Sequence, residues 1–205
     1  MATPTPRTRL SPEDRRRQLL GIGLRMLTER PIQDLSVDAV AVEAGVSRAL
    51  LFRYFPTKSA YHDAVIDAAV RRVLRNTHPD DEAKGARALA QFVRRFLEQV
   101  ERRREFYLAL VYGTGALGLG STRVESVRSG LARTVADILT DGAVDDLSDA
   151  DESVIVGWIA YLETRALLRC DPDRSSHPSV EAEVAHCVAA LDSLRRLPDE
   201  TETEE

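Results

Sequence analysis

The stretch VSRALLFRYFPTK, Val46 to Lys58, places cations among aromatic and aliphatic residues. Its cations are Arg48, Arg53 and Lys58. Guanidinium and ammonium groups bind phosphate oxygens, and arginine can also donate two parallel hydrogen bonds to the edge of a guanine. These residue types therefore suit the recognition of a polyanion, provided that a helix presents them on one outward face.

A pair of short helices is expected to position these cations. Ser36 is a typical N-cap for a helix from Val37 to Ala44, and Gly45 suits the left-handed position that ends such a helix. Ser47 caps the next helix, which must end before Pro56. Two short helices joined by a glycine-containing turn are typical of the helix-turn-helix motif.

The second of these helices has two distinct faces. At about 100° per residue, Phe55 lies within about 40° of Leu51, which we take as the inward direction. Ala49 and Arg53 point nearly opposite, and Arg48, near the helix start, is free to swing outward. The flanks carry Leu50 and Phe52. The outward face is thus small, basic and partly apolar, as a major groove requires.

A longer helix precedes the pair. Ser11 offers an N-cap, Pro12 suits the first helical position, and Glu13 and Asp14 are acids of the first turn. This helix is expected to end before Pro31. Its apolar stripe consists of Leu19, Leu20, Ile22, Gly23, Met26 and Leu27.

The charge of the chain differs between its two parts. The net charge of the 205 residues is −5, which by itself argues against a nucleic-acid partner. Residues 1–60, however, hold 10 Lys and Arg against 6 Asp and Glu, and the remainder holds 18 against 27. A basic amino-terminal module beside an acidic body fits a first part that meets phosphates.

Composition narrows the class of protein. A hydrophobic content of 43% allows a sizeable core. No run approaches the roughly 18 to 20 apolar residues of a membrane span, and residues 1–10 lack the apolar part of a secretory signal, so we expect a cytoplasmic protein. Cys170 and Cys187 lack metal-ligand spacing and are expected to be buried thiols. We predict no metal and no cofactor.

The segment LSVDAVAVEAGVSRALLFRYFPTKSAYHDAV resembles the TetR-type bacterial transcriptional regulators. The resemblance spans about Arg15 to Val70. It implies an all-α dimer, with an amino-terminal three-helix helix-turn-helix head that binds DNA and a helical-bundle body that binds a small ligand and pairs the subunits. The family often has Gly, Thr and Tyr where this chain has Ala49, Leu50 and Phe52, so two hydroxyls that commonly contact DNA are missing.

Each matching residue receives a role on double-stranded DNA. Arg48 is the candidate for bidentate reading of a guanine, and Leu50 or Ala49 could contact a thymine methyl. Arg53 could read a base or bind a phosphate, and Phe52 completes the contact surface. Phosphate contacts that fix the register are expected from Ser36, Ser47, Tyr54 and Lys58.

Four segments are expected along the chain. They are a disordered basic tail (1–10), the helix-turn-helix head (11–56), the ligand-binding and dimerisation body (57–198) and an acidic tail (199–205). Arg7 and Arg9 of the first tail could reach a minor groove, although plain disorder is the simpler interpretation. The body is expected to contain helices over 58–76, 82–103, a shorter one through Tyr112, 121–140, 150–170 and 180–197.

A cluster of large residues in the middle helices of the body suggests a pocket for a largely apolar effector of unknown identity. The predicted lining consists of Phe92, Phe96, Leu110, Tyr112, Trp158, Leu162 and Glu163. Tyr112, Trp158 and Glu163 would supply polar tips, and a cationic centre could face the carboxylate. Most of these residues must also fill the core, and an ordinary salt bridge is the favoured interpretation of Glu163.

The motif GTGALGLG contains G-x-G-x-x-G at Gly113, Gly115 and Gly118, which could form a dinucleotide-binding turn. Its context is wrong, because Asp137 lies inside an amphipathic helical run and no other segment supplies a parallel sheet. We interpret the motif as a flexible connection between body helices.

The last two helices offer apolar stripes for a homodimer interface, represented by Ile155, Leu168, Val184, Val188 and Leu191. The sequence therefore predicts a dimeric repressor that binds a palindromic operator and is released by its effector. A regulator controlled by a protein or redox partner, an activator, and a helical enzyme with a basic head remain the alternatives.

Overall fold

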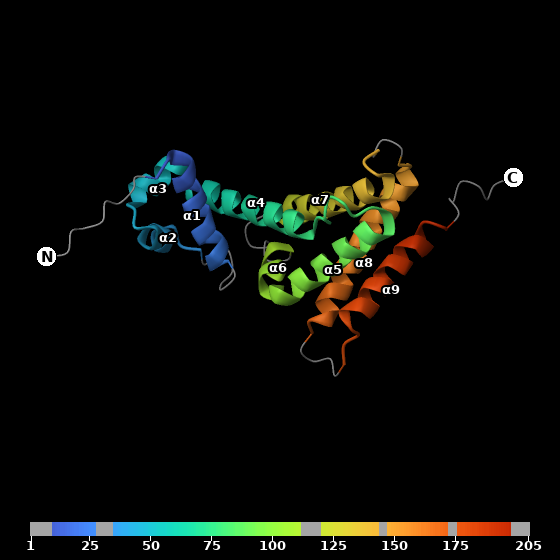
Figure 1. Ribbon diagram of the computed structural model, residues 1–205. Helices are drawn as coiled ribbons and strands as arrows, with labels where there is room; N and C mark the ends of the chain where they lie inside the picture. Colours follow the sequence, from blue (N-terminus) through green and yellow to red (C-terminus); the bar gives the residue numbers. More distant parts are fainter. Residues whose placement is uncertain (1–9, 28–34, 112–119, 144–146, 172–175, 198–205) are drawn as a thin grey trace. The chain divides into compact units, whose positions relative to one another are not determined.

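Residues 10–27, 35–111, 120–143, 147–171 and 176–197 are described in a computed structural model, and their regular elements are all α-helices (Figure 1). This confirms the predicted all-α class. The helices are α1 Pro12–Met26, α2 Val37–Ala44, α3 Arg48–Tyr54, α4 Lys58–Thr77, α5 Gly85–Arg102, α6 Arg104–Val111, α7 Gly120–Thr140, α8 Asp149–Arg169 and α9 Val180–Leu194.

The chain forms two compact units, Met1–Ala69 and Val70–Glu205. We call the first unit the head and the second the body. The division falls within α4, so the head contains α1, α2, α3 and the first part of α4.

The helix starts in the head follow the predicted caps. The hydroxyl of Ser11 accepts a hydrogen bond from the amide of Asp14 at 3.1 Å, and that of Ser47 accepts one from Leu50 at 3.2 Å. Ser36 caps α2 in the same way. Gly45 ends α2 with φ 64°, the left-handed conformation that a glycine adopts without a steric penalty. These contacts confirm the predicted helix-turn-helix boundaries.

The head is held together by contacts between α1, α3 and α4. The hydroxyl of Tyr61 donates a 2.8 Å hydrogen bond to the carbonyl of Leu19, and the Tyr61 ring meets Phe55 edge-on at 5.0 Å. α1 and α4 approach closely at Gly23, where a Cβ atom would lie 2.6 Å from the Tyr61 hydroxyl and 2.6 Å from a methyl of Val65. This packing fixes the base on which α3 rests.

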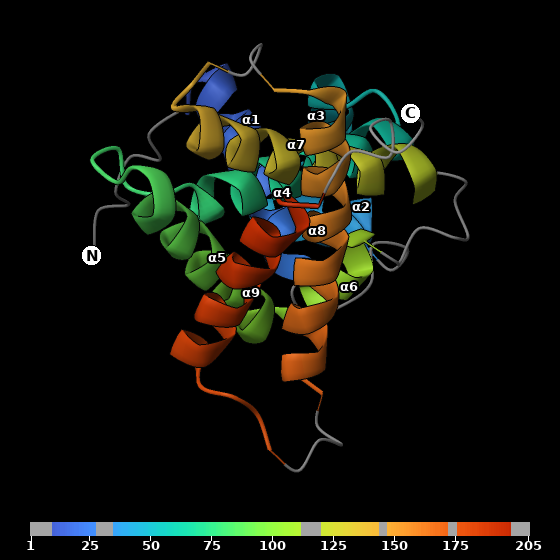
Figure 2. The ribbon, with the colours of Figure 1, turned by 90° about the vertical axis from the view of Figure 1, so that its right-hand side faces the viewer.

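The body packs α5 against α7, α8 and α9, and Figure 2 shows α5, α8 and α9 side by side. Its core is aromatic and aliphatic. The largest fully buried side chains of the body are Phe92, Phe96, Leu97, Tyr107, Leu131, Ile155 and Trp158.

Two helix ends in the body differ from the prediction by more than one residue. α5 begins at Gly85 and not at Glu82, because the amide of Ala83 donates to the carbonyl of Asp80 at 2.9 Å and closes a turn before the helix. α9 ends at Leu194, three residues earlier than predicted.

Candidate nucleic-acid interface and effector site

The third helix presents the predicted outward face. Leu51 and Phe55 are buried, with exposed fractions of 0% and 2%. Arg48, Ala49 and Arg53 are exposed. The flanking side chains are half-buried, and they are Leu50, Phe52 and Tyr54. A major groove admits an α-helix, and this seven-residue helix presents a small, basic exposed face.

Arg48 has a partner in the head that the sequence analysis did not predict. Its Nη1 donates to both carboxylate oxygens of Asp38, at 3.1 Å and 3.2 Å, and its guanidinium lies 5.3 Å from the centre of the Phe52 ring. Asp38 belongs to α2, so the carboxylate comes from the neighbouring helix of the motif. Local sequence patterns do not indicate this contact, because the two residues are ten positions apart.

The predicted phosphate contacts lie at helix starts. The hydroxyl oxygens of Ser36 and Ser47 accept hydrogen bonds from backbone amides. Each hydroxyl also carries an O–H that can donate to a phosphate oxygen. Lys58 is exposed at the first position of α4, whose start is capped by Thr57. Exposed helix starts with a nearby cation favour anions electrostatically.

His62 of α4 is a head residue that sequence reasoning missed. Its ring is buried, and Nε2 lies 2.9 Å from the carbonyl of Leu35, immediately before the N-cap of α2. Burial lowers the pKa of His62 below its usual 6.5, with Lys58 lowering it further and the Leu35 carbonyl and Asp63 opposing the shift. The neutral ring thus ties α4 to the start of α2.

Two of the three polar tips predicted for the effector pocket, Trp158 and Glu163, already form hydrogen bonds within the protein. The indole nitrogen of Trp158 donates to the carbonyl of Cys187 at 2.8 Å. Glu163 is 1% exposed, accepts from the Tyr107 hydroxyl at 2.7 Å and pairs with Arg128 at 2.7 Å. Trp158 is therefore corrected from a ligand-facing donor to a core residue, and Glu163 fits the salt-bridge interpretation.

The other predicted pocket residues divide into two groups. Phe92, Phe96 and Leu162 are each 0% exposed and lie in the body core. Phe96 meets Tyr107 edge-on at 5.6 Å, and Phe92 lies 6.5 Å from Trp158. Tyr112, the side chain of Leu110 and the glycines of GTGALGLG at 113, 115 and 118 lie outside the described residues.

Gln99 of α5 is a polar residue of the body that sequence reasoning missed. It is 7% exposed, and neither its Oε1 nor its Nε2 has a hydrogen-bond partner among the described residues. Gln99 follows Phe96 by three positions, so the two residues share a face of α5. A buried amide without a partner costs about 1 to 3 kcal/mol, which makes this position a candidate contact for a polar ligand group.

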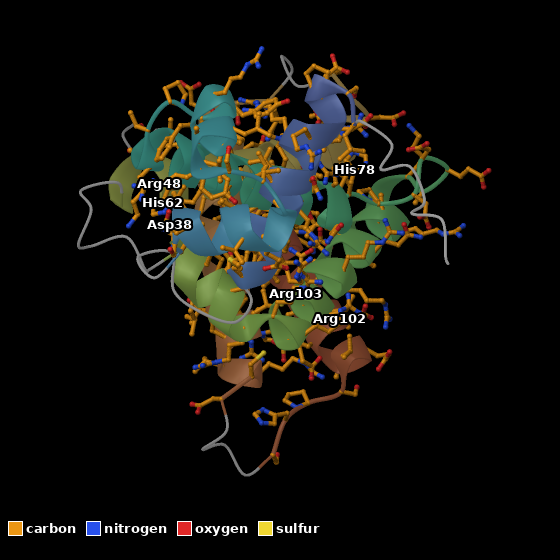
Figure 3. All side chains as sticks on the ribbon, turned by 90° about the vertical axis from the view of Figure 1, so that its left-hand side faces the viewer. Asp38, Arg48, His62, His78, Arg102 and Arg103 are labelled. Atoms are coloured by element: carbon orange, nitrogen blue, oxygen red, sulfur yellow. The ribbon has the colours of Figure 1, made fainter. Side chains whose placement is uncertain are left out.

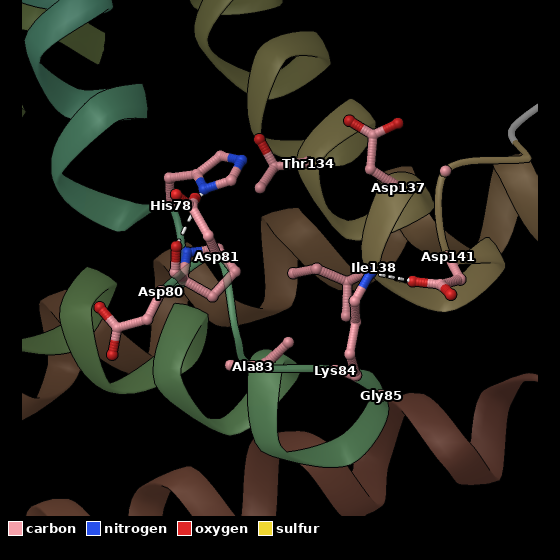
Figure 4. A pocket seen from close by; sticks show the side chains of 13 residues that line it. His78, Asp80, Asp81, Ala83, Lys84, Gly85, Thr134, Asp137, Ile138 and Asp141 are labelled. Carbon is pink, nitrogen blue, oxygen red and sulfur yellow. Dashed lines mark hydrogen bonds and ion pairs between the residues drawn. The ribbon is translucent and has the colours of Figure 1, made fainter.

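A hollow of about 260 Å³ with both polar and apolar lining residues lies where the α4–α5 connection meets α7 (Figure 4). Its lining includes His78, Asp80, Lys84, Asp137 and Asp141. Lys84 pairs with Asp141, and Arg95 binds Asp80 and holds its pKa below the usual range. These carboxylates are engaged by cations of the chain itself. Asp137 is an exposed residue of α7, as expected for its helical run.

The predicted dimer residues need a correction. Ile155, Val184 and Leu191 have exposed fractions of 2%, 6% and 0%, because they pack inside a single chain. Leu168 is exposed and Val188 is half-buried. The outward surface of the same two helices also carries other small and apolar residues, and they are Val156, Tyr161, Ala189, Ala190 and Leu194.

Two further findings concern the described residues alone. None of their helices is long and apolar enough to cross a membrane. Within the same residues, no three His, Cys, Asp or Glu side chains gather where a metal ion could be held.

A helix-turn-helix head joined to a helical body is the architecture of bacterial DNA-binding regulators. Residues 19–64 match the family model for bacterial regulatory proteins of the tetR family. The match lies within the head, which is therefore similar to the heads of that family. The regulator EthR of Mycobacterium tuberculosis is 38% identical over 64 residues, which cover 31% of this chain and 30% of EthR. The matched segment is therefore less than a third of that relative.

Solved structures extend the likeness to the body. A tetR-family regulator from Streptomyces coelicolor matches with a TM-score of 0.69 and 27% identity, covering 90% of this chain and 82% of that one. FadR of Bacillus subtilis, solved in complex with stearoyl-CoA, matches with a TM-score of 0.58 and 16% identity, covering 87% and 95%. The chain therefore has the fold of TetR-family regulators over its body as well as its head.

Proposed function

We propose that this protein is a transcriptional regulator that binds a palindromic DNA operator as a homodimer and responds to a small, largely apolar effector. The observation that carries the proposal is the orientation of α3. Leu51 and Phe55 are buried on its inner side, and the exposed residues Arg48, Ala49 and Arg53 lie on its outer side. Arg48 reads a guanine edge, Ala49 and Leu50 contact thymine methyls, and Phe52 and Arg53 border them. Ser36, Ser47, Tyr54 and Lys58 bind phosphates.

The proposed dimer surface is the outward side of α8 and α9. Val156 is 47% exposed and Leu168 38%, and a hollow of about 480 Å³ lies between Tyr161, His186 and Leu194. The small residues Ala189 and Ala190 line the same hollow. Long helices with exposed apolar and small residues pack well in two-fold bundles. A dimer presents two copies of α3, which suits an inverted repeat in DNA.

The proposed effector contact is the amide of Gln99. The amide offers a donor and an acceptor on the face of α5 that also carries the buried ring of Phe96. An effector with an apolar body and a carbonyl, amide or hydroxyl group would satisfy it, and Phe92, Leu162 and the predicted Leu110 and Tyr112 would border the apolar part. An effector that binds one conformation of the body more tightly than the other shifts the protein toward that conformation. The free energy by which operator binding changes is limited by the difference between the effector's binding free energies for the two conformations.

The test is selection of bound sequences from a randomised duplex pool by the full-length protein. The proposal predicts enrichment of an inverted repeat whose half-sites lie on one face of the DNA, with an affinity that falls steeply as salt increases. Selection that enriches no sequence, or binding of single half-sites by a stable monomer at micromolar concentration, would contradict it. Steady turnover of a small molecule by the same preparation would favour the enzyme alternative.

A further inference from the structure

Asp38 and Arg48 form an ion pair across the helix-turn-helix turn, and Figure 3 shows the two side chains beside each other. Their side chains are 62% and 63% exposed, so the pair lies on the surface of the head. An exposed pair of this kind stabilises a protein by about 0 to 1 kcal/mol, and stability alone is a weak reason for it.

The geometry of the pair matters more than its energy. A single nitrogen of the guanidinium, Nη1, faces both oxygens of the Asp38 carboxylate, at 3.1 Å and 3.2 Å. The other edge of the guanidinium carries Nε and Nη2, two parallel donors that match O6 and N7 of guanine. The Phe52 ring, 5.3 Å from the guanidinium carbon, supports the group from a second direction.

We propose that Asp38 is the positioning residue for base recognition: it holds Nη1 of Arg48 so that the Nε and Nη2 edge is aimed at a guanine. Asp38 does not touch the base. A flexible arginine must be immobilised when it binds, and a carboxylate that fixes it beforehand removes part of that entropic cost. The inference rests on the proposed DNA-binding function.

The proposal separates specific from non-specific binding. The Asp38 carboxylate repels phosphates, so its removal should leave binding to arbitrary DNA unchanged or stronger. The same removal lets Arg48 take many orientations and accept phosphates in place of the guanine. Specific affinity should therefore fall while non-specific affinity does not, a combination that a merely structural role for the pair does not produce.

The experiment compares full-length wild type, Asp38→Asn and Glu43→Gln. Glu43 is the matched control, because it also lies on α2 and pairs with an arginine of the head, Arg25. The probes are the duplex selected by the wild-type protein and a shuffled duplex of the same composition. The preference for the selected duplex is expected to fall about three- to tenfold in Asp38→Asn, which is part of the base discrimination that a bidentate guanine contact supplies. In Glu43→Gln the preference should stay unchanged. Asp38→Asn should lose nothing further in an Arg48→Ala background, because the two residues act as one unit.

The outcomes are distinct. Three results would each overturn the role of Asp38 while leaving DNA binding intact. They are an unchanged preference in Asp38→Asn, equal losses in Asp38→Asn and Glu43→Gln, and full additivity of Asp38→Asn with Arg48→Ala. If selection yields no preferred duplex for the wild type, the proposed function itself fails. Circular dichroism of each variant shows whether the helices are retained, and an Asp38→Asn protein that loses helicity and both affinities together would assign Asp38 a structural role.

Discussion

Replacing Gly23 by alanine is expected to destabilise the head, whereas the same change at Gly21, two positions earlier on α1, is expected to stabilise it. A Cβ at Gly23 would lie 2.6 Å from both the Tyr61 hydroxyl and a Val65 methyl, while a Cβ at Gly21 would meet no atom of the described residues within 4 Å. The Tyr61 hydroxyl cannot retreat cheaply, because it is buried and bonded to the Leu19 carbonyl.

The magnitudes follow from these contacts. Overpacking costs about 1 to 3 kcal/mol, and the threatened Tyr61 hydrogen bond adds about 0.5 to 1.5 kcal/mol. In a helix interior, alanine stabilises the helix by about 1 kcal/mol relative to glycine. Gly23→Ala should therefore lose about 1 to 3 kcal/mol, and Gly21→Ala should gain about 0.5 to 1 kcal/mol.

Hydrogen–deuterium exchange of the α1 and α4 amides is the suitable assay for this pair of variants. The single tryptophan, Trp158, lies in the body, so its fluorescence does not report on the head. Exchange rates give the local free energy of opening directly. Equal and stabilising effects of the two substitutions would refute the close α1–α4 approach.

Three further predictions concern other sites. Because the pKa of His62 is lowered in the folded head, its contribution to stability is fully present above about pH 6.5 and is lost as the pH falls below that value, where the unfolded chain binds the proton more readily. The urea midpoint should therefore decline less with acid in His62→Gln than in the wild type. An equal decline in both proteins would contradict this. Gln99→Leu should raise the free energy of unfolding by about 1 kcal/mol or more, because it removes a buried amide that has no partner among the described residues. An inducer found by screening should lose its effect on this variant, and a destabilised variant with full response would rule out the effector role. Lys58→Ala should weaken binding to all duplexes alike and reduce the slope of log affinity against log salt by about one, whereas loss on the selected duplex alone would make Lys58 a base contact.

The local signals of the head were strong enough to predict its structure. Ser11, Ser36 and Ser47 cap helices as expected, and Gly45 adopts the left-handed conformation that its position requires. These signals lie within a few residues of the element that they define, and helical periodicity predicts that Phe55 lies on the same side as Leu51. Sequence reasoning therefore works where the physics is local.

Contacts between distant residues could not be predicted in the same way. Three contacts form only after the helices have packed. They join Asp38 to Arg48, Tyr107 to Glu163, and Trp158 to the Cys187 carbonyl. Amphipathic α8 has apolar residues on more than one side, so sequence did not distinguish the inward Ile155 from the outward Val156. Gln99 carried no signal, because a glutamine in a helix is normally exposed.

The most direct test of the account is the effect of Arg48→Ala on the two duplexes, measured by fluorescence anisotropy at one salt concentration. If α3 is the recognition helix and Arg48 reads a guanine, affinity for the selected duplex should fall about 5- to 150-fold, as expected for 1 to 3 kcal/mol of base discrimination. Affinity for the shuffled duplex should change far less, by the loss of one cation. Equal losses on both duplexes would show that Arg48 contacts only phosphates, and no loss on either would contradict the assignment of α3 as the DNA-reading helix.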